Sequence, residues 1–161
     1  MDVNFWGTVH CTKFALPELL RNHGSVVGIS SIAGFKGLPG RTGYSASKFA
    51  INGFLESLRC ENLHTGLHVL IASPGYTKSN IRKTALNAHG EAQEETPLKE
   101  DKLMHPDKVA KLIWKAIEKK KRYLIITPLG KAFLFVNKWW TTLADKLAFD
   151  FIKKEPGSPF H

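Results

Sequence analysis

The stretch that decides the fold runs from residue 24 to residue 54 and reads GSVVGISSIAGFKGLPGRTGYSASKFAINGF. It opens with a short apolar run, Ser25–Ile29, which is typical of a strand buried on both faces of a parallel sheet. Residues 33–43 hold four glycines and a proline, so we expect a turn-rich connection there. A helix is then predicted from Tyr44 to about Leu63. This order of elements indicates an α/β protein.

The predicted helix carries a tyrosine and a lysine four residues apart, Tyr44 and Lys48, and this spacing puts both on one face. Because an ammonium near a phenol favours the phenolate, such a pair is suited to general acid–base chemistry near neutral pH. Ser31 follows the predicted strand, where α/β proteins place groups that contact ligands. Taken in isolation, the pair is more typical of a surface helix in which a lysine stem covers a tyrosine.

Further elements are predicted on both sides of this stretch. Residues 2–21 have helical spacing, with Asp2 as a candidate cap and Pro17 expected to kink the later turns. Residues 67–73 form a second buried strand that ends at Pro74 and Gly75. Glycine lets backbone approach a ligand closely and proline makes the turn rigid, so this turn is a candidate binding element.

The C-terminal half of the chain is also predicted to alternate between helix and strand. Residues 78–104 form a long polar loop, either functional or simply solvated. An amphipathic helix is predicted from residue 105 to 119, and 123–127 form a third buried strand. Residues 129–154 are predicted to be one amphipathic, basic helix that packs on the domain or on a partner subunit. Its apolar side would hold Phe133, Val136, Trp140, Leu143, Ala144, Leu147 and Phe151.

Composition restricts the class of protein. The 161 residues are 43% hydrophobic and 23% charged, as in an ordinary single globular domain. The formal charge of +9 is concentrated toward the C-terminus, where residues 119–161 hold nine Lys and Arg against three Asp and Glu. Cys11 and Cys60 are predicted to be buried, reduced thiols of a cytoplasmic protein. The histidines lack metal-ligand spacing, so no metal site is expected, and neither a membrane-spanning run nor a targeting segment is found.

Five segments in a fixed order resemble the short-chain dehydrogenase/reductase family. They are Val3-Asn4-Phe5-x-Gly7, Gly24-Ser25-Val26-Val27-x-Ile29-Ser30-Ser31-x-Ala33-Gly34, Tyr44-Ser45-Ala46-Ser47-Lys48, the strand into Pro74-Gly75, and Ser79 where the family usually has threonine. Together they cover residues 1 to about 85. The residues after Lys48, Phe49-Ala50 and Gly53-Phe54, are similar to those of members that act on hydroxysteroids and other lipophilic carbonyls.

The resemblance implies a Rossmann-like, doubly wound parallel sheet, of which this chain would supply the C-terminal half with about three strands. It implies hydride transfer between a nicotinamide cofactor, NAD or NADP, and an alcohol or ketone. Tyr44 would exchange the hydroxyl proton, and Lys48 would support the phenolate and touch the nicotinamide ribose. Ser31 would hydrogen-bond the substrate oxygen, and Asn4 would hold a proton-relay water.

The same resemblance assigns the cofactor-binding residues. Besides Tyr44 and Lys48, they are Pro74, Gly75, Thr77 and Ser79. The family's substrate lid corresponds to residues 78–104, and the helices at 2–21 and 44–63 correspond to its usual subunit interface, so a homo-oligomer is expected. Residues 1–128 would then be the catalytic half of the cofactor-binding domain, followed by a basic amphipathic tail at 129–161.

One family element is missing from the sequence. No glycine-rich turn of the type Gly-x-Gly-x-x-Gly or Thr-Gly-x-x-x-Gly-x-Gly occurs, although such a turn normally binds the cofactor pyrophosphate. The expectation is therefore an incomplete reading frame with an open sheet edge at Ser25–Ile29, marginal stability and weak cofactor binding. The alternative is a non-catalytic interaction module that retains the sheet without the cofactor site.

Two other partners follow from the basic tail. A basic amphipathic helix with exposed aromatic residues can lie on an anionic membrane surface, so residues 129–154 are a candidate for peripheral membrane contact. Nucleic-acid binding would rest on charge alone, because no recognisable nucleic-acid module is present, and it is not expected.

Overall fold

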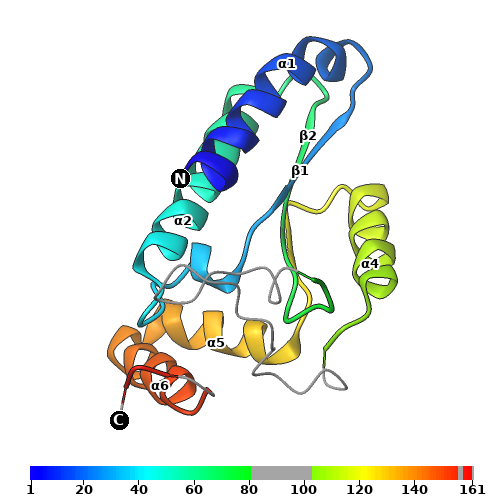
Figure 1. Ribbon diagram of the computed structural model, residues 1–161. Coiled ribbons are helices and arrows are strands. Elements are labelled where there is room, and N and C mark those ends of the chain that lie inside the picture. The colour runs from blue at the N-terminus through cyan, green and yellow to red at the C-terminus, as the bar shows by residue number, and fades with distance from the viewer. Residues whose placement is uncertain (81–102, 156–157, 161) are drawn as a thin grey trace.

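The computed structural model describes residues 1–80, 103–155 and 158–160 (Figure 1). Three parallel strands form one sheet in the order β1-β2-β3, where β1 is Ser25–Ile29, β2 is His68–Ser73 and β3 is Tyr123–Ile125. In the register, Val27 lies opposite Leu70 and Ala72 lies opposite Leu124. The predicted α/β class and the three parallel strands are confirmed, with β3 two residues shorter than expected.

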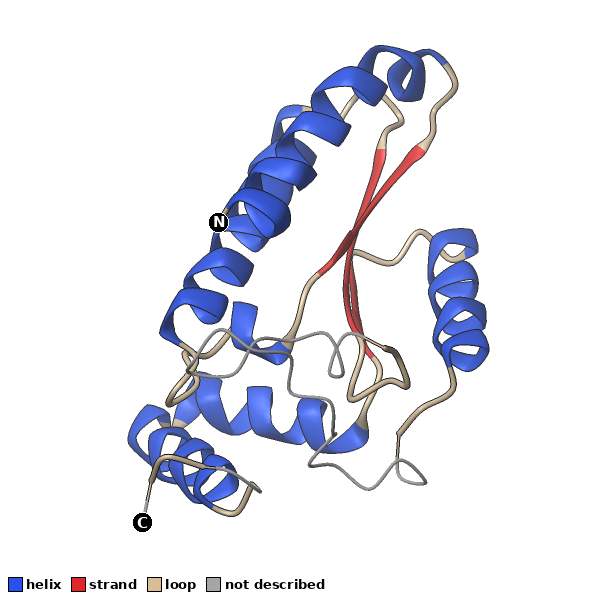
Figure 2. Ribbon diagram, viewed as in Figure 1, coloured by secondary structure: helices blue, strands red, loops and turns tan. Residues whose placement is uncertain are grey.

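Helices cover both faces of the sheet (Figure 2). The central strand β2 is buried along its whole length, and successive side chains point to opposite faces. Val69 and Ile71 pack with Ile51 and Leu55 on one face, whereas Leu70 and Ala72 pack with Ala116 on the other. The long helices on the first face bring the residues of the candidate site to the sheet.

The first face is covered by two helices that run alongside each other. The chain begins with a π-helical turn, η1 (Asp2–Trp6), which continues into α1 (Gly7–Arg21), and Pro17 lies inside α1. The second helix, α2 (Thr42–Glu61), starts two residues before Tyr44. The predicted Asp2 cap is wrong, because the N-cap residue is Met1 and makes no side-chain capping bond.

The opposite face is covered by α4 (Pro106–Glu118). His105 caps this helix, since its imidazole accepts a hydrogen bond from the Asp107 backbone N–H. Val109 and Ala116 are the buried residues of α4. The lysines of its last turn and of the turn that follows are exposed, as expected for the solvated, basic end of a helix.

The C-terminal segment forms two helices where the sequence predicted one. They are α5 (Pro128–Trp139) and α6 (Thr141–Lys153), and the break is at Trp140, whose non-helical backbone has φ −134° and ψ 73°. Thr127 caps α5 by accepting a hydrogen bond from the Gly130 N–H. Because the helical phase is reset at the break, a single helical wheel drawn through 129–154 misassigns the faces.

The buried face of α6 therefore differs from the prediction except at Ala144, which was predicted to face inward and is buried. It consists of the smaller residues Ala144 and Ala148 together with Ile152. Four of the larger apolar residues predicted to face inward are instead 43–57% exposed: Trp140, Leu143, Leu147 and Phe151.

The cysteine prediction also needs correction. Cys11 and Cys60 are free thiols, but both are exposed rather than buried. None of the helices in the described ranges combines the length and the apolar character that a transmembrane span requires.

Candidate active site

The predicted catalytic pair lies in the first two turns of α2, at the carboxyl ends of the strands. Lys48 Nζ is 5.7 Å from the centroid of the Tyr44 ring, so the lysine amine and the phenol share one face of the helix. The same amine donates a 2.9 Å hydrogen bond to the backbone carbonyl of Ile29, the last residue of β1. Burial lowers the pKa of Lys48. Tyr44 remains 42% exposed and is therefore accessible to a ligand.

Ser31 lies directly beyond the end of β1, at the start of the short 3-10 helix η2 (Ile32–Gly34). It is the N-cap of η2, and its hydroxyl accepts a 3.2 Å hydrogen bond from the Ala33 N–H. This bond occupies one lone pair, and the hydroxyl proton can still be donated to a carbonyl oxygen.

A buried polar network fixes the segment that carries Ser31. Ser30 Oγ donates to Asn52 Oδ1 at 2.6 Å, and Asn52 Nδ2 donates to the carbonyl of Gly34 at 2.8 Å. A Cβ on Gly34 would lie only 2.6 Å from Ser30 Oγ and 2.8 Å from Asn52 Nδ2. Glycine is therefore required at this position, and the network ties η2 to the middle of α2.

Asn4 lies within the π-helical turn η1, a local geometry that often marks functional sites. Its side-chain amide donates a 3.0 Å hydrogen bond to Ser47 Oγ, which in turn donates to the Tyr44 carbonyl at 2.7 Å. The backbone carbonyl of Asn4 accepts a bond from Thr8 Oγ1. The structure thus connects Asn4 to the turn of α2 that carries Tyr44, through a serine that the sequence analysis did not single out.

The predicted cofactor segment begins at Pro74 and Gly75, directly after β2, and the chain bends at Tyr76. A Cβ on Gly75 would lie 2.5 Å from Thr127 Cγ2, so the backbone approaches the start of α5 too closely for a larger residue. Thr77 Oγ1 donates to the Gly75 carbonyl at 3.0 Å, and Ser79 is exposed. The hydroxyl of Ser73, immediately before this turn, is buried without a hydrogen-bond partner among the described residues.

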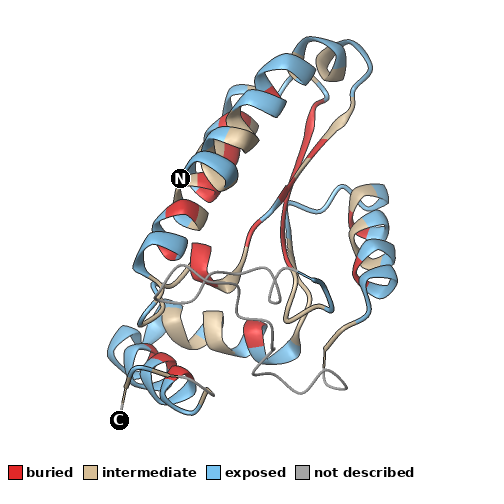
Figure 3. Cartoon of the chain, viewed as in Figure 1, coloured by how far each residue is buried: buried red, intermediate tan, exposed pale blue. Residues whose placement is uncertain are grey.

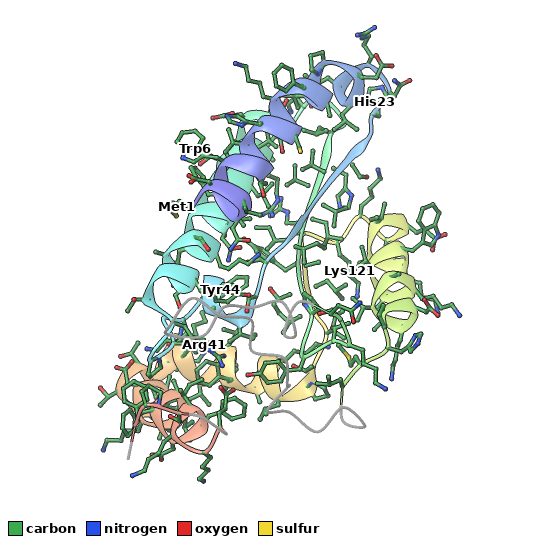
Figure 4. The ribbon with its side chains drawn as sticks, viewed as in Figure 1. Met1, Trp6, His23, Arg41, Tyr44 and Lys121 are labelled. Atoms are coloured by element: carbon green, nitrogen blue, oxygen red, sulfur yellow. The ribbon has the colours of Figure 1, made fainter. Side chains whose placement is uncertain are left out.

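A cluster of three polar side chains borders the site and was not predicted. Arg41, the N-cap of α2, donates to Tyr76 Oη at 3.4 Å and forms an ion pair with Glu155. Tyr76 donates its own hydroxyl hydrogen to Glu155. We call this set the Arg41–Tyr76–Glu155 clasp. It joins the start of α2, the segment after β2 and the residues after α6, and Figure 4 shows Arg41 near Tyr44, with which it interacts electrostatically.

Burial and charge shift the proton affinities within the clasp. Burial acts to lower the pKa of Arg41, but the hydrogen bond to Tyr76 and the charge of Glu155 hold it above its usual value. Burial raises the pKa of Tyr76, the bond from Arg41 opposes this shift, and Glu155 adds to it. No sequence signal identifies the clasp, because its members are 35 and 114 positions apart from Arg41 and belong to no motif.

An open groove of about 540 Å³ runs between α1 and the edge of β1 that faces away from β2. In the described part of the chain, β1 pairs with β2 alone. Asn4 and Lys48 line the groove together with Cys11, Thr12 and apolar residues of β1. Two of the predicted catalytic residues therefore face a space that is open along the sheet edge.

The remaining predictions concern the loop and metals. Most of the proposed substrate lid, residues 81–102 of 78–104, lies outside the described residues. Within the described ranges, no group of three or more His, Cys, Asp or Glu side chains is placed to hold a metal ion.

The comparisons with known proteins agree with this architecture. A family model described as "short chain dehydrogenase" matches residues 1–90. The chain is 31% identical over 159 residues to "Dehydrogenase/reductase SDR family member 7B" of Danio rerio, covering 98% of this chain and 52% of that protein. It is 36% identical over 128 residues to "Dehydrogenase/reductase SDR family protein 7-like" of Drosophila melanogaster, covering 79% of this chain and 39% of that protein.

A solved structure gives the same result for the fold. A short-chain dehydrogenase from Burkholderia cenocepacia, crystallised in complex with NADP, superimposes with a TM-score of 0.73 at 17% identity. The superposition covers 91% of this chain and 56% of that one. The chain spans about half the length of the curated relatives it matches. The family-model match extends over more than half of its residues, and the chain therefore belongs to the short-chain dehydrogenase family.

Proposed function

We propose that this chain provides the catalytic half of an oxidoreductase that interconverts an alcohol and a ketone with NAD or NADP. The observation that carries the proposal is the arrangement around α2, where the Lys48 amine lies 5.7 Å from the Tyr44 ring centroid. Asn4 is tied to the same helix, and Ser31 caps η2 beyond the neighbouring strand. The relatives and the NADP-bound structural neighbour support the same class of reaction.

The residues present fit the nicotinamide half of such a cofactor. Ser73 offers a buried hydroxyl without a partner among the described residues, and Lys48 offers an amine at the end of β1. Pro74, Gly75, Thr77, Ser79, Tyr44 and Lys48 would hold the nicotinamide and its ribose. The cofactor, when bound, supplies or accepts the hydride. The sequence has no glycine-rich turn for the pyrophosphate, so the proposed contacts are confined to this half.

The side chains of the site would move the proton and orient the substrate. Tyr44 would donate its phenolic proton to the substrate oxygen during reduction and remove it during oxidation. Lys48 would place positive charge beside the phenolate, which is the form that must be stabilised after proton donation. Ser31 would hold the substrate oxygen through its free hydroxyl proton, and Asn4 would support reprotonation of the site. Residues 1–128 would carry this chemistry, with 129–161 as a separate C-terminal tail.

The first experiment measures contact with the cofactor without requiring turnover. Saturation-transfer NMR with nicotinamide mononucleotide should show transfer to the nicotinamide and ribose protons. Lys48→Met should weaken this transfer, whereas Lys111→Met on the exposed side of α4 should leave it unchanged. Equal signals from both variants would exclude Lys48 from the nicotinamide site.

The second experiment tests the chemistry. Turnover of a panel of lipophilic ketones is followed through the absorbance of NADH and NADPH. Loss of general acid–base catalysis in Tyr44→Phe should reduce the rate about 10²- to 10⁴-fold while leaving nicotinamide mononucleotide contact intact. A fully active Tyr44→Phe variant would remove Tyr44 from the mechanism. Cofactor contact without turnover of any ketone by the unmodified chain would favour the alternative of a non-catalytic module.

A further inference from the structure

The C-terminal helix pair exposes an unusual amount of apolar surface. Of the eighteen exposed large apolar side chains among the described residues, eight lie within the 23 positions from 129 to 151. They are Leu129, Phe135, Trp139, Trp140, Leu143, Leu147, Phe149 and Phe151, which are between 39% and 69% exposed. Single exposed apolar residues are normal on a protein surface, whereas a concentration of them marks an interaction surface.

Six of these residues form a stripe across both helices. At 100° per residue, Phe135 and Trp139 lie on the solvent side of α5, opposite the buried Gly130. Leu143, Leu147 and Phe151 are spaced four residues apart and form a line along α6. The break between the helices joins the two parts, because the rings of Phe135 and Trp140 are 6.4 Å apart between centroids. We call these six residues, Phe135, Trp139, Trp140, Leu143, Leu147 and Phe151, the α5–α6 apolar stripe.

Lysines flank the stripe on α5, whereas on α6 the exposed Asp150 lies at its edge beside Lys146. Lys131 and Lys138 lie along one edge of it on α5, and Lys138 Nζ is 5.2 Å from the centroid of the Trp139 ring. The helices contain five lysines if the capping residue Lys154 is included, and two aspartates, of which Asp145 forms an ion pair with Lys36. A lysine stem beside an aromatic ring can bury its methylene groups while the ammonium reaches a phosphate.

The other residues of α5 and α6 attach the two helices to the rest of the protein and leave the stripe at the surface. Ala144, Ala148 and Ile152 face inward from α6, and Asn137 of α5 donates to the Phe35 carbonyl. Figure 3 shows α6 exposed along most of its length apart from this buried line. The small residues thus anchor the helix, while the large ones face solvent.

We propose that the α5–α6 apolar stripe binds the surface of an anionic lipid bilayer, with both helices lying in the interface. The combination of Trp, Phe and Leu on one side with lysines along its edges is the pattern of interfacial helices. Electrostatic attraction of the lysines to anionic lipid selects this occupant over a second copy of the chain, whose corresponding surface carries the same positive charge. The proposal does not depend on the proposed catalytic function.

Vesicle flotation tests the proposal with the whole chain. Phosphatidylcholine vesicles are compared with vesicles that also contain phosphatidylserine, at low and high salt. The chain should float with the anionic vesicles, less so at high salt, and much less with the neutral ones. Absence of binding to anionic vesicles at low salt would overturn the proposal.

Two pairs of variants separate the apolar and charged contributions. Phe135→Ser with Trp139→Ser should weaken binding about tenfold or more, whereas the control Trp114→Ser, an equally exposed tryptophan on α4, should not. Lys131→Glu with Lys138→Glu should weaken binding to anionic vesicles about tenfold, whereas Lys111→Glu with Lys115→Glu on α4 should have a smaller effect. Circular dichroism of each variant checks that the fold is retained.

A different occupant would give a different pattern. If the stripe is covered by a second copy, analytical ultracentrifugation should show a dimer that Phe135→Ser with Trp139→Ser dissociates. That result, combined with vesicle binding that neither variant pair changes, would replace the lipid surface by a subunit interface.

Discussion

Helices α2 and α6 are both amphipathic, but they place their large residues on opposite sides. In α2 the residues against the sheet include Ile51 and Leu55, at 2% and 0% exposure. In α6 the buried line is Ala144, Ala148 and Ile152, and the larger side chains face solvent. The difference shows that α2 is held by the core of this chain through its large side chains, whereas α6 packs through its smaller ones and leaves large apolar side chains exposed.

The largest effect on stability should come from the buried side of α2. Leu55 packs over Gly28 of β1, where an added Cβ would lie 2.1 Å from Leu55 Cδ1. Leu55→Ala should therefore lower the free energy of unfolding by about 3 kcal/mol, through lost burial and a cavity. In α6, Leu147→Ala should change it by no more than about 0.5 kcal/mol, because Leu147 is already 43% exposed. Urea unfolding measures both; similar losses would show that the two helices are held alike.

The next largest effect tests the polar part of the α2 interface. Asn52→Ala removes both side-chain bonds to the Ser30–Gly34 segment and leaves buried polar groups unpaired. The free energy of unfolding should fall by about 2 kcal/mol. Asn22→Ala is the matched control, since its side-chain bonds are at the exposed end of α1. Equal effects in urea unfolding would mean that the network does not fix the segment carrying Ser31.

A smaller effect is expected where the two helices are linked, at the Arg41–Tyr76–Glu155 clasp. The Glu155 side chain is 16% exposed and that of Arg41 is 35% exposed, so their ion pair is partly shielded from water. Glu155→Gln should lower the free energy of unfolding by about 1 kcal/mol. Glu18→Gln, which affects an ion pair exposed by 65–73%, should have almost no effect. If thermal unfolding shows equal losses of stability for the two variants, the clasp does not stabilise the packing of α6.

The smallest effect concerns alkaline pH. Because burial raises the pKa of Tyr76 above its ordinary value of 10.0, its contribution to stability is fully present below pH 10. The contribution is lost as the pH rises through the higher value in the folded state. Tyr76→Phe should therefore remove a late-titrating phenol from the absorbance at 295 nm. Tyr123→Phe is the comparison, since burial raises the pKa of Tyr123 as well; an unchanged titration curve for Tyr76→Phe would contradict the placement of Tyr76 in the clasp.

The sequence predicted what depends on local pattern. The strand Ser25–Ile29 and the start of α4 were correctly located, since apolar runs and a proline at a helix start are local signals. Prediction from the sequence was wrong where tertiary contacts or a change in helical phase determine which side chains are buried. The non-helical backbone at Trp140 reset the helical faces after it, and Cys11 is exposed where it lines the open groove between α1 and β1.

The residues of the candidate site also fall into two groups, those that a local motif predicts and those that only the structure reveals. Tyr44, Lys48, Ser31 and Asn4 could be named because they belong to motifs with fixed spacing, and their roles stay proposals. The hydrogen-bonded link through Ser47 and the ion pair of Glu155 with Arg41 could not be named, because they arise only when distant segments meet. Long-range side-chain pairs leave no periodic signal in one sequence.

The exposed Cys11 beside the groove along β1 gives the protein a chemical reporter of its own. Whatever segment or ligand fills that groove should slow alkylation of this thiol, whereas Cys60 on α2, outside the groove lining, supplies an internal reference in the same molecule. The ratio of the two labelling rates, read by mass spectrometry, would follow groove occupancy without any engineered probe.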